Sequence, residues 1–242
     1  MRQSSAEFGQ LLFKAARGVG LPLGVAEDLV TPILWLQTCG LPGDVEAVNM
    51  LTGLDERRVP GVFPDLTIRP DENMTANRTL SAIYLAAAGC DSLQLGWPGT
   101  DAEILMTAVD SPLFTATALS LAHRKLNADF ILTVRTAGHV LSSNQKGEVI
   151  CIKRNGQEPE TLAPEAVEIQ LSASKNLENT ANGAVLVDAD REIQFLLRCE
   201  SEGLSADENN IRRLKSLADR LLVPESQHSL KYGAGAGIVD TD

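Results

Sequence analysis

The chain has 242 residues, of which 44% are hydrophobic and 4% aromatic, and its formal net charge is −11 at pH 7. A chain of this length and composition builds a core of Leu, Ile, Val and Ala without metals or disulfides, which excludes disorder over its whole length. The negative charge disfavours nucleic acid and anionic membrane surfaces as partners, because such ligands are bound through Lys and Arg. No apolar run approaches about 18 residues, so we expect no transmembrane segment.

The cysteines and the N-terminus point to a reducing compartment. Four cysteines lie far apart with no C-x-x-C pair, and no apolar signal run follows the initial Met. Reduced thiols in a cytoplasmic protein are therefore expected.

The N-terminal region is predicted to be helical. Ser4 and Glu7 have the capping-box spacing that opens a first helix, which the glycines at 18 and 20 end. A second helix opens at Pro22 and runs to residues 39–40, with Pro32 predicting a kink or an early break. A third, weaker helix starts at Asp44 and ends before Gly53.

Residues 59–77 are rich in Pro, Asp and Arg without periodicity, which indicates a loop or a boundary. We therefore divide the chain into a helical N-terminal subdomain, residues 1–58, and an α+β domain, residues 59–242. The glycine-rich tail closes the second domain.

The α+β domain is predicted to hold a mostly antiparallel sheet. A helix capped by Ser111, with Pro112 at its first position, extends to about residue 126, and residues 144–147 form a hairpin turn. A final helix begins with a capping box at Ser205 and Glu208. The overall class is α+β, with helices at both ends of the chain packed on the sheet. The expected strands are 103–109, 130–134, 140–142, 149–153, 167–171, 184–187 and 192–197.

The C-terminal tail has glycine at every second position and then two carboxylates. One interpretation is that its backbone N–H groups bind an anion or pass close to another backbone, while the carboxylates orient a substrate or hold a divalent cation. The other is a disordered terminus. The residues concerned are Gly233, Gly235, Gly237, Asp240 and Asp242.

The glycines between the first two helices do not form a dinucleotide-binding fingerprint, because their spacing is wrong and no strand precedes them. They predict a helix–helix turn. Lys14 and Arg17 precede this turn, and Glu27 and Asp28 follow it, so these charges either face a cleft or pair on the surface. The three histidines have no metal-ligand spacing, and neither a P-loop nor a nucleophile elbow is present, so we assign no metal site.

Two stretches of the chain resemble a proteobacterial family of unknown function. The N-terminal stretch has the sequence KAARGVG, residues 14–20, followed by GVAE, residues 24–27, and Trp35-Leu36. The C-terminal stretch has Val223-Pro224 followed by the GAGAG and D-x-D tail. The resemblance implies no activity or cofactor, but it makes the tail, Arg17 and Glu27 stronger site candidates.

Two functions remain open. In the first, the chain binds or transforms a small anionic metabolite between the N-terminal helices and the tail, with Lys14 or Arg17 holding the anion and Glu27 as a general base. In the second, it is a non-catalytic assembly protein whose tail docks on a partner or on a second copy, giving a homo-oligomer. The sequence slightly favours the first.

Overall fold

The computed structural model describes residues 1–64, 66, 79–96, 103–126, 130–144, 146–154, 165–172 and 183–221. Its helices are α1 (Ser5–Gly18), α2 (Leu23–Thr38), α3 (Gly43–Asp55), α4 (Ala82–Gln94), α5 (Pro112–His123), α6 (Ala189–Glu202), α7 (Glu208–Ala218) and the 3-10 helix η1 (Asp219–Leu221). Its strands are β1 (Arg2–Gln3), β2 (Glu103–Val109), β3 (Ile131–Arg135), β4 (His139–Ser143), β5 (Val149–Arg154), β6 (Glu165–Ser172), β7 (Gly183–Val187) and β8 (Leu204–Ser205).

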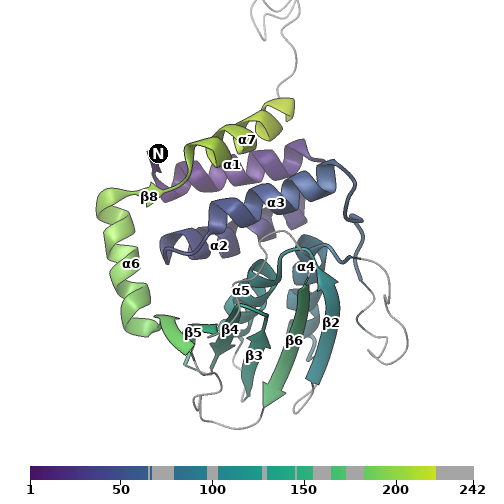
Figure 1. Cartoon of the computed structure of the whole chain (residues 1–242), viewed down its shortest axis with the longest axis vertical. Helices are drawn as coiled ribbons and strands as arrows, with labels where there is room; N and C mark the ends of the chain where they lie inside the picture. The colour runs from purple at the N-terminus through teal and green to yellow at the C-terminus, as the bar shows by residue number, and fades with distance from the viewer. Residues whose placement is uncertain are drawn as a thin grey trace, which may run out of the picture.

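The larger sheet confirms the predicted α+β class. Its strands lie in the order β2-β6-β3-β4-β5-β7, and every neighbouring pair is antiparallel. Helix α5 packs against β3, β4 and β6, and α4 packs against α5, so both helices cover one face of the sheet (Figure 1). The predicted hairpin joins β4 to β5, with Ser143 opposite Val149.

Helices α1, α2, α3 and α7 form a layer above the sheet, whereas α6 lies at the side of the molecule (Figure 1). Within this layer α1 packs between α2 and α7, although α7 is remote in sequence. The close contact depends on Gly18, because a Cβ there would lie 1.9 Å from the carbonyl oxygen of Leu217. The C-terminal helix is thus part of the same layer as the first three helices, and the proposed boundary at residue 58 stays a prediction.

A buried carboxylate joins α3 to α7. Asp44 is 5% exposed, and its Oδ2 accepts hydrogen bonds from the backbone N–H of Asp207, at 2.8 Å, and from the Asn210 amide, at 3.1 Å. Asp207 is itself the N-cap of α7 and accepts from the backbone N–H groups of Asn209 and Asn210. The predicted capping box at Ser205 is therefore wrong, since Ser205 belongs to β8 and pairs with Arg2 of β1.

The predicted strand at 192–197 is also wrong. Residues 192–197 are not a strand but part of α6, which Asp188 opens by accepting a hydrogen bond from the Arg191 N–H at 2.9 Å. The short apolar run there is compatible with both the helical and the strand periodicity, and the N-cap at Asp188 favours the helix. Helix α2 continues through Pro32 to Thr38, so the early break does not occur, while the alternative of a kink stays a prediction. Packing of α2 against α1, α3, α4 and α5 offsets the backbone hydrogen bond that Pro32 cannot form.

Among the described residues, no helix combines the length and the apolar character needed to cross a bilayer. Of the predicted loop at 59–77, the described part covers 59–64 and 66. The glycine-rich tail lies outside the described residues.

Candidate functional site

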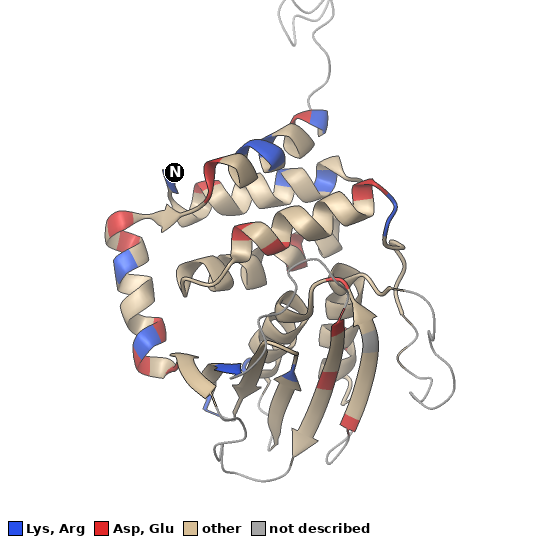
Figure 2. Ribbon diagram, in the orientation of Figure 1, with Lys and Arg blue, Asp and Glu red and all other residues tan. Residues whose placement is uncertain are grey.

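A cavity of about 580 Å³ lies where the α1–α2 turn meets the end of α3, and we call it the arginine cleft. It is lined by Val19, Gly20, Leu21, Leu54, Arg57, Arg58, Val59, Pro60, Gly61, Thr79 and Tyr84. Two of these residues are basic and none is acidic. Figure 2 shows basic residues both at this end of α1 and in the segment that follows α3.

The predicted helix–helix turn forms one wall of the arginine cleft. The Leu21 N–H donates to the Ala16 carbonyl at 3.1 Å, and Gly20 adopts φ +92°, a left-handed conformation that glycine tolerates best. The Arg17 guanidinium donates to the Leu21 carbonyl. Arg17 is thus engaged in holding the turn and does not line the cleft.

The opposite wall contains an arginine in an unfavourable backbone conformation. Arg57 follows the C-cap of α3 and has φ +56°. Its N–H donates to the Leu54 carbonyl at 3.0 Å, while the Arg58 N–H donates to the Gly53 carbonyl at 2.9 Å. Glycine usually occupies such a position, and a side chain with a Cβ costs about 1 kcal/mol there. Arginine therefore occupies a position where glycine is expected to be more stable.

The charges around the arginine cleft leave one arginine available. Arg58 pairs with Glu56 at 2.7 Å, and Arg220 of η1 pairs with Asp55, a bond that lowers the pKa of the Asp55 carboxyl. Arg57 is exposed, and within the described ranges no ion pair engages its guanidinium. Burial raises the pKa of Tyr84 further above neutral. Its hydroxyl is protonated at neutral pH and can donate a hydrogen bond.

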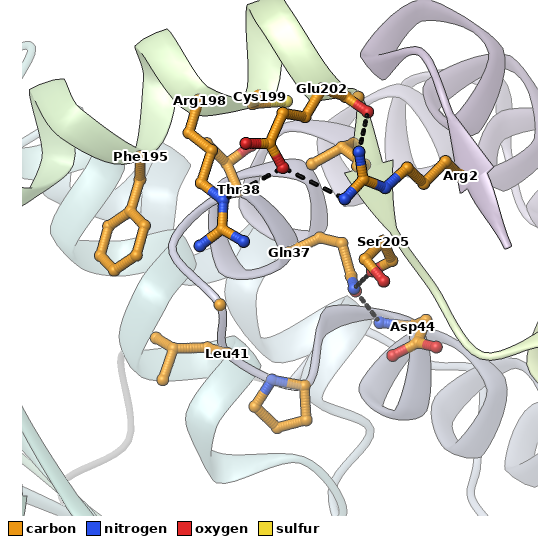
Figure 3. A pocket seen from close by; sticks show the side chains of 14 residues that line it. Arg2, Gln37, Thr38, Leu41, Asp44, Phe195, Arg198, Cys199, Glu202 and Ser205 are labelled. Carbon is orange, nitrogen blue, oxygen red and sulfur yellow. Dashed lines mark hydrogen bonds and ion pairs between the residues drawn. The ribbon is translucent and has the colours of Figure 1, made fainter.

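A second cavity, of about 480 Å³, lies between the α2–α3 loop and α6, and Figure 3 shows its lining side chains. Its two arginines are occupied by an internal acid: Glu202 Oε2 lies 3.1 Å from Arg2 Nη2 and 3.4 Å from Arg198 Nε. Asp44 also lines this cavity. An external anion would have to displace Glu202.

A third cavity, of about 460 Å³, has mostly apolar walls from α2, α4 and α5. Glu27, Asp28 and Lys125 line it. Burial, and then the negative charges of Asp91 and Glu27, raise the pKa of Asp28. The structure thus places Glu27 on a different cavity from Arg57 and does not bring it together with Arg17.

The predicted site residues are therefore dispersed. Lys14 is exposed on α1, one turn before Arg17, and the glycines and aspartates of the tail lie outside the described residues. The last described residue, Leu221, directly follows Arg220, whose partner Asp55 lies on the last turn of α3. The described part of the chain thus ends beside the helix that leads into the arginine cleft, while the roles of Lys14, Arg17, Glu27 and the tail stay predictions.

A half-buried acidic cluster between α3 and the start of α5 was not predicted. The Ser111 hydroxyl donates to Glu46 Oε2, and Asp110 Oδ1 accepts from the Ala82 N–H at 2.7 Å. Burial raises the pKa of Glu46 to about 7 and that of Asp110 to about 6. Asp110 Oδ2 is buried and has no hydrogen-bond partner among the described residues. The sequence around these residues shows no hydrophobic alternation and no motif. The cluster forms only because the fold brings Glu46 of α3 against Ser111 at the start of α5.

No metal-binding group is formed by the described residues: none of their His, Cys, Asp and Glu side chains cluster in threes. The buried His123 directs Nδ1 at the Ser143 hydroxyl, 2.7 Å away. The four cysteines are free thiols, as expected.

Residues 3–81 match the model of a family described as a protein of unknown function (DUF3726). All lining residues of the arginine cleft except Tyr84 fall in this range, and so does the N-terminal stretch of the resemblance, whereas its C-terminal stretch lies outside. No curated protein matches the chain. The match supports an uncharacterised family.

One solved structure has a similar fold. It is a candidate malate/lactate dehydrogenase from E. coli. The superposed region covers 96% of this chain and 98% of the dehydrogenase chain, with a TM-score of 0.54 and 6% sequence identity. At this identity the likeness concerns the fold alone.

Proposed function

We propose that this protein binds a small anionic metabolite, a carboxylate or a phosphate, in the arginine cleft. The observation that carries the proposal is Arg57, an exposed arginine without an ion pair among the described residues. It is held in a left-handed backbone conformation at the wall of a cavity whose described lining residues include no acid. Strain kept at such a position is typical of functional sites.

The other cavities support the choice by contrast. The cavity of Figure 3 contains Glu202 between its two arginines, and the apolar cavity has two acids and one lysine. A ligand anion gains most where the guanidinium has no internal partner, because it need not break an existing ion pair. The size of the arginine cleft, about 580 Å³, also suits a small metabolite.

The ligand would contact the cleft through two kinds of donor. Arg57 and Arg58 supply guanidinium N–H groups and Tyr84 supplies a hydroxyl, while Gly20 in the α1–α2 turn has no side chain to fill the cleft. The fold likeness to a candidate malate/lactate dehydrogenase makes malate and lactate reasonable first probes, with inorganic phosphate as the third.

The test substitutes Arg57 with glycine, a change with two opposite expected effects. Removing the strain should raise the free energy of unfolding by about 1 kcal/mol, a rise in Tm of about 2 to 4 °C. Removing the guanidinium should weaken binding of the best probe about tenfold or more. Urea unfolding and isothermal titration calorimetry measure the two effects.

Arg213→Ala is the matched control, because Arg213 is an exposed arginine on α7 that does not line the cleft. It removes the same charge and should leave affinity unchanged. If both variants weaken binding equally, or if Arg57→Gly and Arg58→Ala both leave it unchanged, the proposal is wrong. Truncation after Leu221 tests the predicted contribution of the tail, and Arg17→Ala that of Arg17.

A further inference from the structure

The apolar cavity, which α2, α4, α5 and the residues just after α5 line, combines hydrophobic walls with a charged rim. Its volume of about 460 Å³ suits a small molecule. Glu27, Asp28 and Lys125 lie exposed at the rim. An occupant that fits both parts has an apolar body and a charged group. The buried hydrophobic side chains of the walls include Leu29, Ile83, Ala86, Phe114, Ala118 and Leu121.

Helices α4 and α5 pack together and run in the same direction. At the start of both helices, the Ala82 N–H of α4 donates to Oδ1 of Asp110, which lies just before α5, at 2.7 Å. Further along, the Cys90 thiol of α4 donates to the Ala118 carbonyl of α5 at 3.6 Å. The C-terminal ends of the two helices therefore lie near each other.

Both of these C-terminal ends face the apolar cavity. Gln94, the last residue of α4, and Ala122, in the last turn of α5, line it. The C-terminal end of a helix carries a partial negative charge of roughly half an elementary charge. Two such ends near each other repel, so a cation bound close to them lowers the electrostatic energy.

The side chains around these helix ends add more negative than positive charge. Burial raises the pKa of the Cys90 thiol to about 12, and the charges of Asp28 and Asp91 add to this rise. Lys125 opposes it, so all three charges lie near this thiol. Among the described residues, neither Lys125 nor the carboxylates of Glu27, Asp28 and Asp91 form an ion pair. Three carboxylates thus surround one ammonium group, which leaves the local charge negative.

We propose that the apolar cavity binds a small organic ammonium, a molecule with an aliphatic or aromatic body and a protonated amine. The body occupies the space between the hydrophobic walls, and the amine lies beside Asp28, in the negative potential of Glu27, Asp91 and the two helix ends. An organic anion of the same shape would meet like charges there. The ligand is thus opposite in charge to the anion of the arginine cleft.

Isothermal titration calorimetry at pH 7 with hexylammonium as the probe tests the proposal. Hexanoate is the matched probe of opposite charge, and hexylammonium should bind at least about tenfold more tightly. Methylammonium has the same charge without the apolar body. It should also bind at least about tenfold more weakly than hexylammonium, because it buries less apolar surface.

Two substitutions at the rim should change hexylammonium affinity in opposite directions. Asp28→Asn removes a carboxylate while keeping the shape of the side chain, and should weaken binding about tenfold. Lys125→Gln removes a repulsive charge and should strengthen binding about threefold at low salt, an effect that shrinks as salt increases. Asp190→Asn is the matched control, because Asp190 is exposed on α6 and does not line the cavity. It should leave the affinity unchanged.

Circular dichroism and Tm verify that the three variants are folded. The proposal is overturned if hexylammonium does not bind at millimolar concentration, or if hexanoate binds as tightly. It is also overturned if Asp28→Asn and Asp190→Asn bind hexylammonium equally well.

Discussion

Gly18→Ala should lower the free energy of unfolding by about 3 kcal/mol, because the added methyl group cannot be accommodated between α1 and α7. A Cβ at this position would lie 1.9 Å from the Leu217 carbonyl oxygen and 2.8 Å from its carbonyl carbon. Both are backbone atoms of a helix, so relief requires α7 to move away from α1. Urea unfolding followed by circular dichroism measures the loss.

Gly24→Ala provides the control within the same glycine pattern. Gly24 lies in the first turn of α2 and is exposed, and a Cβ added there would meet no atom within 4 Å beyond its own helix. Alanine there should be neutral or raise stability by up to about 1 kcal/mol, since it favours the helix. Equal stability of the two variants would contradict the assignment of Gly18 to the α1–α7 contact.

This contrast shows what local sequence patterns could predict in this chain. The capping box at Ser4 and Glu7 and the Asn144–Gly147 hairpin region follow from interactions within a few residues, and the structure confirms both. Helix α4 was not predicted, because its alanine-rich segment is buried on most sides and shows little amphipathic periodicity. Helix α6 was mistaken for a strand because six residues do not distinguish the two periods.

The candidate site was harder to predict from the sequence than the helices and strands, because tertiary contacts bring its residues together. The glycine turn at 18–20 was predicted, but only the fold shows that Arg57 lies across the cavity from it, and only its φ of +56° marks it as unusual. The sequence indicates Lys14, Arg17 and Glu27 as site residues because they flank the turn and lie in the N-terminal stretch of the resemblance. The helices carry Glu27 to another cavity, since α2 directs that part of its surface towards α4 and α5.

Glu46→Gln should make stability less dependent on pH. Burial raises the pKa of Glu46 to about 7 in the folded chain from 4.5, so the folded state binds more protons than the unfolded state between these values. Stability from this group is therefore fully present below about pH 4.5 and is lost as pH rises towards 7. The total loss is about 3 kcal/mol.

The glutamine variant removes this titration while retaining a side chain that can hydrogen-bond to the Ser111 hydroxyl. Relative to the unaltered chain, its stability should increase by about 2 kcal/mol between pH 5.5 and pH 8, most of the titration interval. Urea unfolding at both pH values measures the difference. Glu200→Gln, which removes an exposed carboxylate on α6, should show no such pH-dependent gain.

Asp110 titrates in the same direction, with a pKa raised to about 6, and Glu165, whose pKa burial also raises, contributes a like charge. Replacing Asp110 with asparagine should therefore lower the pKa of Glu46, because one repulsive neighbour is lost. NMR titration of the Glu46 carboxyl in both proteins measures this shift. An unchanged Glu46 pKa in Asp110→Asn and a parallel pH profile of Glu46→Gln would together show that Glu46 is solvated in the folded chain, contrary to its position between α3 and α5.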